Sequence, residues 1–471
     1  MEKDRQRESE SKGITRRSFV RTGGAALAGG AALGGAAIPA GAAEKGPNTG
    51  RPTLFPSQPR QEARIQAYRT LGRTGFQVSD VGMGSVPLRE TSVVRYAYDK
   101  GINYFDTAEG YGNGAAERAI GEAAQHMERD KIFIATKGRV GDQDDTEAVV
   151  TQIRQSLERL NTDYIDSYSM HGPSTLEALN HQGYHAAMAL LKAEGRVRFC
   201  GVSNHGPSSP TQLSMGDLLS AAAEDGRFDM MLLVYNFLNH EEGDRVLAAC
   251  KANNVGTTAM KTSPGSLQYE PVDPENLSAE QEQYIQRLTG RGSSREAAME
   301  RLQGQAERQK DTYDKTRPFA DQYGIQTQDQ LRLGSIHWVL QNPDMHTACI
   351  SFTEFDLVDK VVPLSGTRLT PPEEQMLSQI GLSLDNQYCR HGCFECVEKC
   401  PQEVPVSTIM RYAYYYQGQG QEKFAMSKYA ALEGRGASPC LDCQGQCAGA
   451  CRYGLDIQTN MLQVHNLLTL A

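Results

Sequence analysis

The sequence predicts an α/β protein built on a (β/α)8 TIM barrel, with a small cysteine-rich domain after it. Eight short apolar runs alternate with amphipathic stretches, and ionisable residues fall where several of these runs end. Strands that alternate with helices pair in parallel through right-handed crossovers, and eight such units suffice to close a barrel. The second domain is predicted because eight of the 11 cysteines lie between Cys389 and Cys451.

The expected strands follow one another regularly along the chain. They are residues 78–84, 102–106, 132–137, 164–171, 197–203, 228–235, 256–261 and 347–350. Before them, two strand-like runs at 68–71 and 76–78 flank the turn-forming residues 72–75, which predicts a hairpin. A doubly wound open sheet is the alternative. No glycine-rich phosphate loop follows the first strand to support it.

One segment interrupts the alternation between the seventh and eighth strands. Residues 267–326 are polar and charged, and residues 296–315 have the composition of a solvated helix. Loops that follow barrel strands lie at the catalytic face. The insertion is therefore either a surface segment without a role in catalysis or a lid over the site. The barrel is expected to span residues 67–370, and the cysteine-rich domain residues 380–471.

The first 43 residues predict an export signal. Thr15-Arg-Arg-Ser-Phe-Val20 is a twin-arginine pattern, an uncharged stretch rich in Ala and Gly follows, and Ala40-Gly-Ala42 offers small residues to a peptidase. Residues 44–66 are expected to be a linker. These features predict Tat export to the periplasm or another extracytoplasmic space. Membrane association would follow only if the signal stays uncleaved.

Charge and cysteine placement narrow the function classes. The net charge is −9 and no strongly basic stripe occurs, which argues against a nucleic-acid partner. Cys200, Cys250 and Cys349 lie among apolar neighbours and are expected to be small buried hydrophobic residues.

Four residues at the predicted strand ends are candidates for catalysis. Asp106, Lys137 and His171 end the second, third and fourth strands, and Tyr111 lies in the loop DTAEGYGNG after Asp106. Polar groups at the carboxyl ends of barrel strands are usually catalytic. Each of these residues, taken alone, could have a purely structural role. Four such residues at one rim of the barrel are much less easily explained by structural roles alone.

The residue types indicate proton-coupled hydride transfer to or from a carbonyl group. A tyrosine with its ordinary pKa of about 10 is a weak acid at neutral pH, and a nearby lysine cation lowers that pKa. Asp106 can hold Lys137 charged and oriented. Tyr111 then serves as general acid for the carbonyl oxygen, and His171 donates a hydrogen bond that orients the substrate.

These motifs resemble the aldo-keto reductase family. The match begins at YRTLGRTGFQVSDVGMG and continues through INYFDTAEGYGNGAAERAIGEA, KIFIATKG, SLERLNTDYIDSYSMH and EGRVRFCGVSNH to about Asp359. The resemblance implies an NAD(P)H-dependent oxidoreductase acting on a small carbonyl or alcohol substrate. It also implies that Tyr111 is the acid, Lys137 and Asp106 its tuning pair, and His171 the residue that orients the carbonyl.

The resemblance further implies where the nicotinamide cofactor lies across the barrel mouth. One pair of residues should approach the nicotinamide ribose, a second pair the carboxamide, and a third the pyrophosphate. In that order the pairs are Gly84 and Ser85, Ser203 and Asn204, and Ser263 and Gly265.

Several positions depart from the family pattern. Leu232 stands where a glutamine commonly contacts the carboxamide, and Met260 replaces the aromatic that often stacks on nicotinamide. The methionine is a pattern associated with iron–sulfur-bearing relatives. The loop after the eighth strand carries Glu354 and Asp356 where a basic residue usually meets the adenosine phosphate. Carboxylates there repel a 2′-phosphate, which weakens the NADPH assignment and leaves NADH open.

The cysteine tail contains two runs of four. They are Cys389-x3-Cys393-x2-Cys396-x3-Cys400-Pro and Cys440-x2-Cys443-x3-Cys447-x3-Cys451. Both resemble the bacterial ferredoxin run C-x2-C-x2-C-x3-C-P, which predicts one or two 4Fe–4S clusters. In that pattern the fourth cysteine of each run ligates the other cluster, so Cys400 should complete the second site and Cys451 the first.

Zinc sites and disulfides are the alternatives for these cysteines, because four-cysteine zinc sites have similar spacing and exported proteins form disulfides. Each run has one gap longer by one residue than the ferredoxin pattern, and Arg452 stands where the second run should have proline. The two tight quartets, the Cys-Pro and the folded-export signal favour iron–sulfur. The chain therefore resembles aldo-keto reductases that carry a C-terminal ferredoxin-like module.

The predicted barrel and the predicted iron–sulfur domain transfer different numbers of electrons. Nicotinamide transfers two electrons together, whereas a 4Fe–4S cluster accepts one, and the sequence shows no clear flavin motif. Structural clusters, a further electron-transfer partner, or a barrel that no longer uses free nicotinamide cofactor would each resolve this mismatch. A weakly catalytic or non-catalytic sensor or subunit is the second function hypothesis. The sequence does not identify the substrate.

Overall fold

The computed structural model describes residue 60 and residues 62–469, except 87, 89, 208–211, 264–270, 290–293, 326, 385–388, 391, 418–421 and 433–435. The chain divides into two units, Met1–Arg51 and Pro52–Ala471, and all described residues belong to the second. The predicted export signal and most of the predicted linker therefore lie outside the described residues.

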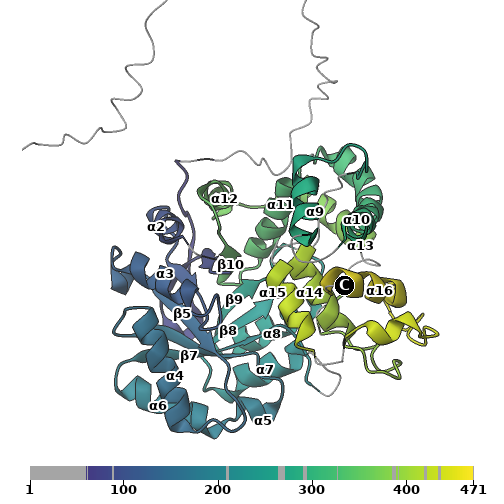
Figure 1. Ribbon diagram of the computed structural model, residues 1–471. Coiled ribbons are helices and arrows are strands. Elements are labelled where there is room, and N and C mark those ends of the chain that lie inside the picture. The colour runs from purple at the N-terminus through teal and green to yellow at the C-terminus, as the bar shows by residue number, and fades with distance from the viewer. Residues whose placement is uncertain are drawn as a thin grey trace, which may run out of the picture. The chain divides into compact units, whose positions relative to one another are not determined.

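Eight parallel strands close into a barrel in the order β10-β3-β4-β5-β6-β7-β8-β9 (Figure 1). The strands are β3 (Val81–Gly84), β4 (Tyr104–Asp106), β5 (Phe133–Gly138), β6 (Ile165–His171), β7 (Val197–Asn204), β8 (Met230–Val234), β9 (Gly256–Met260) and β10 (Thr347–Ser351). The predicted (β/α)8 barrel is confirmed, and the doubly wound open sheet is wrong.

The first predicted strand proves to be two strands. β1 (Tyr68–Thr70) and β2 (Gln77–Ser79) form the predicted antiparallel hairpin across the 3-10 turn Gly72–Thr74. The barrel begins only at β3, so a single strand over residues 78–84 is wrong. The break lies at Asp80, whose buried carboxylate accepts hydrogen bonds from Ser365 Oγ at 2.6 Å and Gly366 N at 3.0 Å. These bonds hold the chain where it turns from the hairpin into the barrel.

The crossover helices follow from amphipathic patterning and from capping. They are α2 (Thr91–Asp99), α3 (Ala115–Ala124), α4 (Thr146–Arg159), α5 (Leu176–Leu179), α6 (Gln182–Ala193), α7 (Met215–Asp225), α8 (Glu241–Ala252), α11 (Gln328–Gln341) and α12 (Phe355–Val361). In α4, Val149, Ile153 and Leu157 recur every four residues and are all buried. The side chain of Asp145 caps this helix by accepting from Ala148 N at 2.9 Å.

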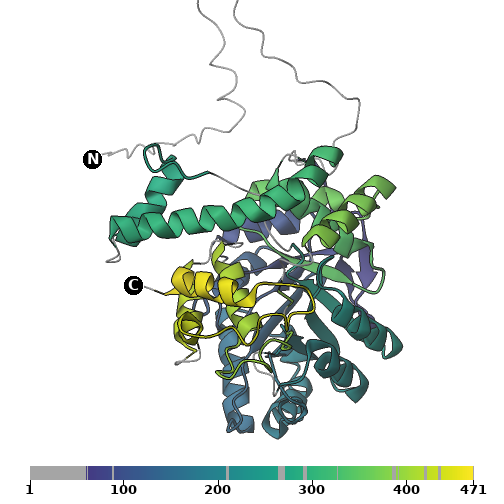
Figure 2. The ribbon, with the colours of Figure 1, turned by 90° about the vertical axis from the view of Figure 1, so that its right-hand side faces the viewer.

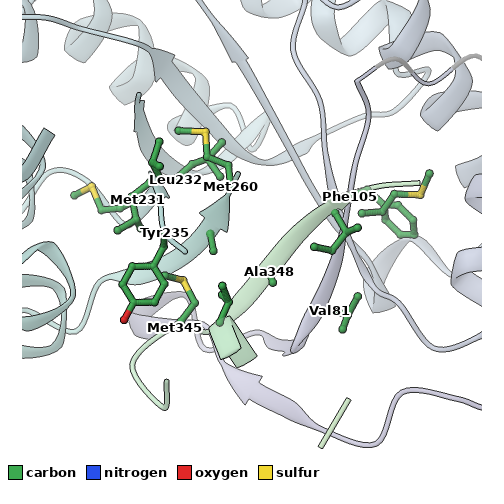
Figure 3. Close-up of a cluster of buried hydrophobic side chains, with 14 of the residues drawn as sticks. Val81, Phe105, Met231, Leu232, Tyr235, Met260, Met345 and Ala348 are labelled. Atoms are coloured by element: carbon green, nitrogen blue, oxygen red, sulfur yellow. The ribbon is translucent and has the colours of Figure 1, made fainter. Parts of the chain in front are cut away.

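Apolar side chains from strands on several sides of the barrel form its core. Figure 3 shows part of this core, with Val81 of β3, Phe105 of β4, Leu232 of β8 and Met260 of β9 among the buried residues. Tyr104, Phe133 and Met230, from three other strand positions, form a separate buried cluster. Packed side chains thus fill much of the barrel, as in other barrels of this type.

A second core joins the insertion to the cysteine-rich region. The helices α9 (Ala279–Thr289) and α10 (Arg295–Tyr323) come from the insertion, and α14 (Val406–Gln417), α15 (Glu422–Ala430) and α16 (Ile457–Leu468) come from the C-terminal region. Ile285, Leu302, Ile409 and Met461 are buried together in this core. Figure 2 shows the long helix α10 passing close to α16.

These contacts correct two expectations. Residues 296–315 are not simply a solvated helix, because Ala298 and Leu302 lie in the second core. The packing of the barrel continues past residue 370, since α13 (Pro371–Leu384) places Met376, Leu377 and Ile380 in the barrel core. Among the described helices, none is both long and apolar enough to cross a membrane.

Candidate functional site

A buried ion pair lies at the mouth of the barrel. Lys137 Nζ is 2.6 Å from Asp106 Oδ1, and it also donates to the carbonyl oxygen of Thr107 at 2.7 Å. Both side chains of the pair are buried. The same ammonium lies 5.2 Å from the ring centroid of Tyr111, and the Tyr111 and His171 rings meet edge to face with their centroids 6.1 Å apart.

The strand register explains this convergence. Asp106 is the last residue of β4 and pairs with Ala135 of β5, two residues before Lys137. His171 is the last residue of β6. Because neighbouring parallel strands end at one rim, residues 31 and 34 positions apart in the chain become neighbours in space. Tyr111 reaches the same rim from the loop after β4. The structure therefore brings all four predicted catalytic residues together.

The pKa of Tyr111 differs from the sequence expectation. Burial raises the pKa of Tyr111 to about 12, although the cation of Lys137 acts in the opposite direction. The expectation that the lysine brings this pKa below its ordinary value is wrong for this structure, because burial outweighs the lysine. Tyr111 is consequently fully protonated at neutral pH and available as a proton donor.

The pKa values of His171 and Lys137 are shifted in opposite directions. Burial, assisted by the positive charges of Lys137 and Arg139, lowers the pKa of His171 to about 3. Burial also disfavours the charged form of Lys137, but Asp106 and Tyr111 outweigh it and raise the pKa of Lys137 above its ordinary value. At neutral pH the site therefore holds a lysine cation beside a neutral imidazole, which offers one N–H donor and one acceptor.

A buried hydroxyl directly after β3 lacks a partner in the part of the chain that the structure describes. Ser85 Oγ is buried and makes no hydrogen bond with a described residue. Gly84, just before it, packs closely, because a Cβ added there would lie 3.0 Å from Cys349 Sγ and 3.3 Å from Ser351 Oγ. A buried hydroxyl without a partner is costly unless a ligand satisfies it. Ser85 therefore fits the role of hydrogen-bonding a cofactor ribose.

The predicted carboxamide contacts are partly engaged by the protein itself. Asn204 Nδ2 donates to Pro173 O at 2.8 Å, and Asn204 Oδ1 accepts from Gly206 N at 2.6 Å. Ser203 Oγ donates to Met170 O over a longer 3.4 Å. An amide side chain has two donors and two acceptor lone pairs, so Asn204 keeps one of each for a ligand.

The remaining positions are Leu232, where the family pattern has a glutamine, and the predicted cofactor residues Met260, Ser263 and Gly265. Leu232 and Met260 are only 8% and 9% exposed and belong to the barrel core, so neither offers a polar contact. The carbonyl oxygen of Ser263 accepts a hydrogen bond from Tyr414 Oη at 3.0 Å. Gly265 lies outside the described residues.

The tail cysteines fall into two groups of four. Burial raises the pKa of Cys389, and Cys396, Cys393 and Cys451 lie near enough to raise it further. The same four cysteines line one cavity, together with apolar side chains that include Val406.

The second group is centred on Cys440. Burial raises the pKa of Cys440 to about 11, and the neighbouring Cys400, Cys447 and Cys443 contribute to the increase. Each group therefore contains three cysteines of one run and the last cysteine of the other. The two groups adjoin, because Cys447 also lies near Cys396.

The two runs are followed by matching helices. α14 begins at Val406, six residues after Cys400, and α16 begins at Ile457, six residues after Cys451. All 11 cysteines are free thiols, so the disulfide alternative finds no pair in this structure. In the part of the chain that the structure describes, no three His, Cys, Asp or Glu side chains converge tightly enough for a single metal ion.

Comparison with known proteins decides the family. The sequence model of the aldo/keto reductase family matches residues 83–380, which is more than half of the chain. The chain belongs to the aldo/keto reductase family.

The relatives of this aldo/keto reductase match only in part. A probable aldo-keto reductase 1 from Glycine max is 34% identical over 167 residues, covering 31% of this chain and 47% of the relative. The uncharacterized oxidoreductase YqkF from Bacillus subtilis is 35% identical over 153 residues, covering 30% and 49%. The chain thus spans about half the length of these curated relatives. A solved aldo-keto reductase from Bacillus halodurans aligns with 20% identity and a TM-score of 0.49, over 67% of this chain and 96% of that one.

Sequence reasoning missed residues that lie beside the quartet in this aldo/keto reductase. Cys349 of β10 lies next to Asp106 at the rim, although it was expected only as a buried hydrophobic residue. Lys261 follows β9 directly, and its ammonium lies 4.1 Å from the ring centroid of Tyr415 in α14. Lys261 could have been found from the sequence, because it ends a predicted strand and polar residues at the carboxyl ends of barrel strands are often functional, as for Lys137. Nothing in the sequence indicated that Tyr415 would lie nearby.

The electrostatics of His171 lead to a direct prediction. Because its pKa is lowered to about 3, the His171 imidazole should stay neutral from pH 8 down to about pH 4. The hydrogen bond from His240 to Asp244 raises the pKa of His240, so that imidazole should protonate above its ordinary value of 6.5. An NMR titration of 15N-labelled histidine, assigned with His171→Gln and His240→Gln variants, measures both. Protonation of His171 near pH 6.5 would contradict the burial described here.

Proposed function

We propose that this protein is an aldo-keto reductase-type oxidoreductase that reduces a small carbonyl compound to an alcohol or catalyses the reverse reaction. The observation that carries the proposal is the buried Lys137–Asp106 pair beside Tyr111, with the neutral His171 facing the same tyrosine. A charged lysine next to a buried tyrosine is suited to stabilise a phenolate formed when the tyrosine gives up its proton.

The chemistry of the reduction can be assigned atom by atom. A nicotinamide cofactor, when bound, supplies the hydride that forms the new C–H bond at the carbonyl carbon. The carbonyl oxygen takes the proton of Tyr111 Oη, and Lys137 stabilises the resulting phenolate. Asp106 keeps Lys137 in place and charged, while the N–H of His171 orients the carbonyl oxygen. Tyr111 regains a proton from solvent after the alcohol leaves.

Ser85, Ser203 and Asn204 supply the hydrogen-bonding groups that fit a nicotinamide cofactor. Lys360, the basic residue of α12, already pairs with Asp329 at 2.6 Å and with Asp356 at 2.7 Å. These two carboxylates neutralise the ammonium of Lys360, so it is poorly suited to bind a 2′-phosphate. We propose NAD(P)H as the cofactor, with NADH favoured by these carboxylates. A solved aldo-keto reductase from Klebsiella pneumoniae is described in complex with NADPH.

A non-catalytic sensor or subunit is the second candidate. Leu232 favours it, because this buried apolar residue provides no polar group for the carboxamide. A fluorescence titration with NADH and NADPH separates the two candidates. Absence of binding by either cofactor would remove the reductase proposal.

The assigned acid can be tested with Tyr111→Phe. Loss of the proton donor should lower kcat about 10²- to 10⁴-fold, with cofactor affinity unchanged. Methylglyoxal and L-galactose are suitable first compounds, since similar proteins are named methylglyoxal reductase and L-galactose dehydrogenase. Tyr98→Phe on α2 is the matched control and should keep full activity. Full carbonyl reduction by Tyr111→Phe would show that another group supplies the proton.

We further propose that the two cysteine groups hold 4Fe–4S clusters. Three observations support ferredoxin-like ligation. Cys451 lies with the cysteines of the first run and Cys400 with those of the second, an apolar cavity adjoins the first group, and each run is followed by a helix at the same spacing. Each cluster exchanges one electron, so its redox partner would be a one-electron carrier protein. Zinc remains the competing metal, and metal analysis distinguishes it.

Each proposed cluster takes its fourth ligand from the other cysteine run, so replacing the last cysteine of one run should affect the cluster of the other run. Cys451→Ser should remove about half of the iron and sulfide, and should impair the cluster held by Cys389, Cys393 and Cys396. Cys250→Ser, in the barrel, is the matched control and should keep all the iron. Iron, sulfide and visible absorption of anaerobically purified protein measure the outcome. Colourless protein containing zinc would refute the clusters.

We also propose that the protein is exported through the Tat pathway, on the basis of Arg16 and Arg17 in the twin-arginine pattern. Replacing both arginines with lysine should hold the full chain in the cytoplasm. Cell fractionation and immunoblotting compare this variant with the wild type. Equal export of both proteins would show that the arginine pair is not the signal.

A further inference from the structure

The helices after the first cysteine run cover part of the barrel mouth. Tyr414 Oη of α14 donates to Ser263 O after β9 at 3.0 Å. The ammonium of Lys261 lies 4.1 Å from the ring centroid of Tyr415 and 5.2 Å from that of Tyr414. Figure 1 shows α14 and α15 beside β9, and in Figure 2 these helices lie in front of the barrel.

This contact lies close to the quartet. Tyr415 is near enough to Tyr111 for its charge to raise the pKa of Tyr111, although burial is the larger cause. Lys428 of α15 and Arg139 after β5 both lie near His171, and together with burial they lower its pKa. The C-terminal helices therefore contribute side chains to the surroundings of the reacting carbonyl.

Four cationic side chains gather here. Those of Arg139, Lys261, Arg411 and Lys428, the cationic cluster, make no ion pair or hydrogen bond with a carboxylate among the described residues, although the backbone N–H of Arg139 donates to Glu109 Oε1 at 3.2 Å. Of the carboxylates at the rim, Asp106 already pairs with Lys137, and Glu109 accepts from the backbone N–H of Arg139 and from Gln152 Nε2. Arg411 Nε is buried and has no hydrogen-bond partner among the described residues.

Such an arrangement is unfavourable unless an anion completes it. Burial lowers the pKa of Lys261 and of Lys428, and Arg411 lowers both further through its like charge. Partly buried like charges repel one another, and an unsatisfied guanidinium N–H costs free energy. A bound carboxylate or phosphate would satisfy Arg411 Nε and neutralise its neighbours.

We propose that the cationic cluster binds the anionic group of the substrate, so that the substrate is a carbonyl compound bearing a carboxylate or phosphate. The inference rests on the proposed carbonyl chemistry at Tyr111. A cofactor phosphate is the other source of such an anion. Lys261 begins the loop after β9, two residues before Ser263, which is expected to approach the cofactor pyrophosphate. The substrate is favoured because Lys428 and Arg139 lie near His171, the residue expected to orient the carbonyl group.

The test compares a charged aldehyde with its neutral ester. Isothermal titration calorimetry on the full-length, cofactor-loaded protein measures the Kd of 4-carboxybenzaldehyde and of methyl 4-formylbenzoate, independently of turnover. The wild type should bind the acid about ten- to a hundredfold more tightly than the ester, as expected for charge-assisted hydrogen bonds. Arg411→Gln and Lys428→Gln, on different helices, should each remove most of this preference, while Arg411→Lys should retain part of it.

Lys423→Gln is the matched control, because it removes the same charge from an exposed position of α15 and should leave the preference unchanged. A wild type that binds acid and ester equally overturns the inference. So do variants that weaken NADH or NADPH binding but keep the preference, since the anion would then belong to the cofactor. A preference for the acid without reduction of either aldehyde would sustain the anion site and refute the carbonyl reductase activity.

Discussion

The ion pair between Lys137 and Asp106 is the interaction on which the proposed chemistry of this site depends. Both side chains are buried, and the ammonium is held by one carboxylate oxygen and one backbone carbonyl. Removing one partner of such a buried pair typically costs about 3–5 kcal/mol, because the other charge is left without compensation. The pair exists because β4 and β5 are adjacent parallel strands whose ends meet at one rim. It in turn keeps a permanent positive charge beside Tyr111 and helps to keep His171 neutral.

The C-terminal helices are part of the electrostatic environment of the barrel. Tyr415 and Lys428 act on the pKa of Tyr111 and of His171, and the tyrosine-rich helix α14 packs on the end of β9. Burial under these helices strengthens every charge interaction at the rim, because less water screens it. This also explains why the pKa of Tyr111 rises despite the lysine. In this family member the surroundings of the candidate site are therefore shared by the barrel and the region that carries the cysteines.

The insertion and the cysteine-rich region support each other. Ile285 and Leu302 from the insertion share a core with Ile409 and Met461, which follow the two cysteine runs. Most of the buried residues of this core come from the cysteine-rich region, and the insertion adds a smaller set that packs against them. The insertion thus packs against the helices that follow the cysteine runs, which its polar composition alone did not predict.

The sequence by itself determined the barrel and the identities of its rim residues. Alternating apolar runs predicted a parallel sheet that closes into a barrel, and the strand ends of such a barrel carry Asp106, Lys137 and His171 to one rim. It also predicted that Cys400 and Cys451 join the opposite groups, as the structure has them. Only the tertiary structure decided the protonation of the site, because burial depends on what covers the mouth, and no local pattern encodes that. Likewise, only the fold brought Tyr415, Arg411 and Lys428 to Lys261, since contacts between segments about 150 residues apart arise from packing.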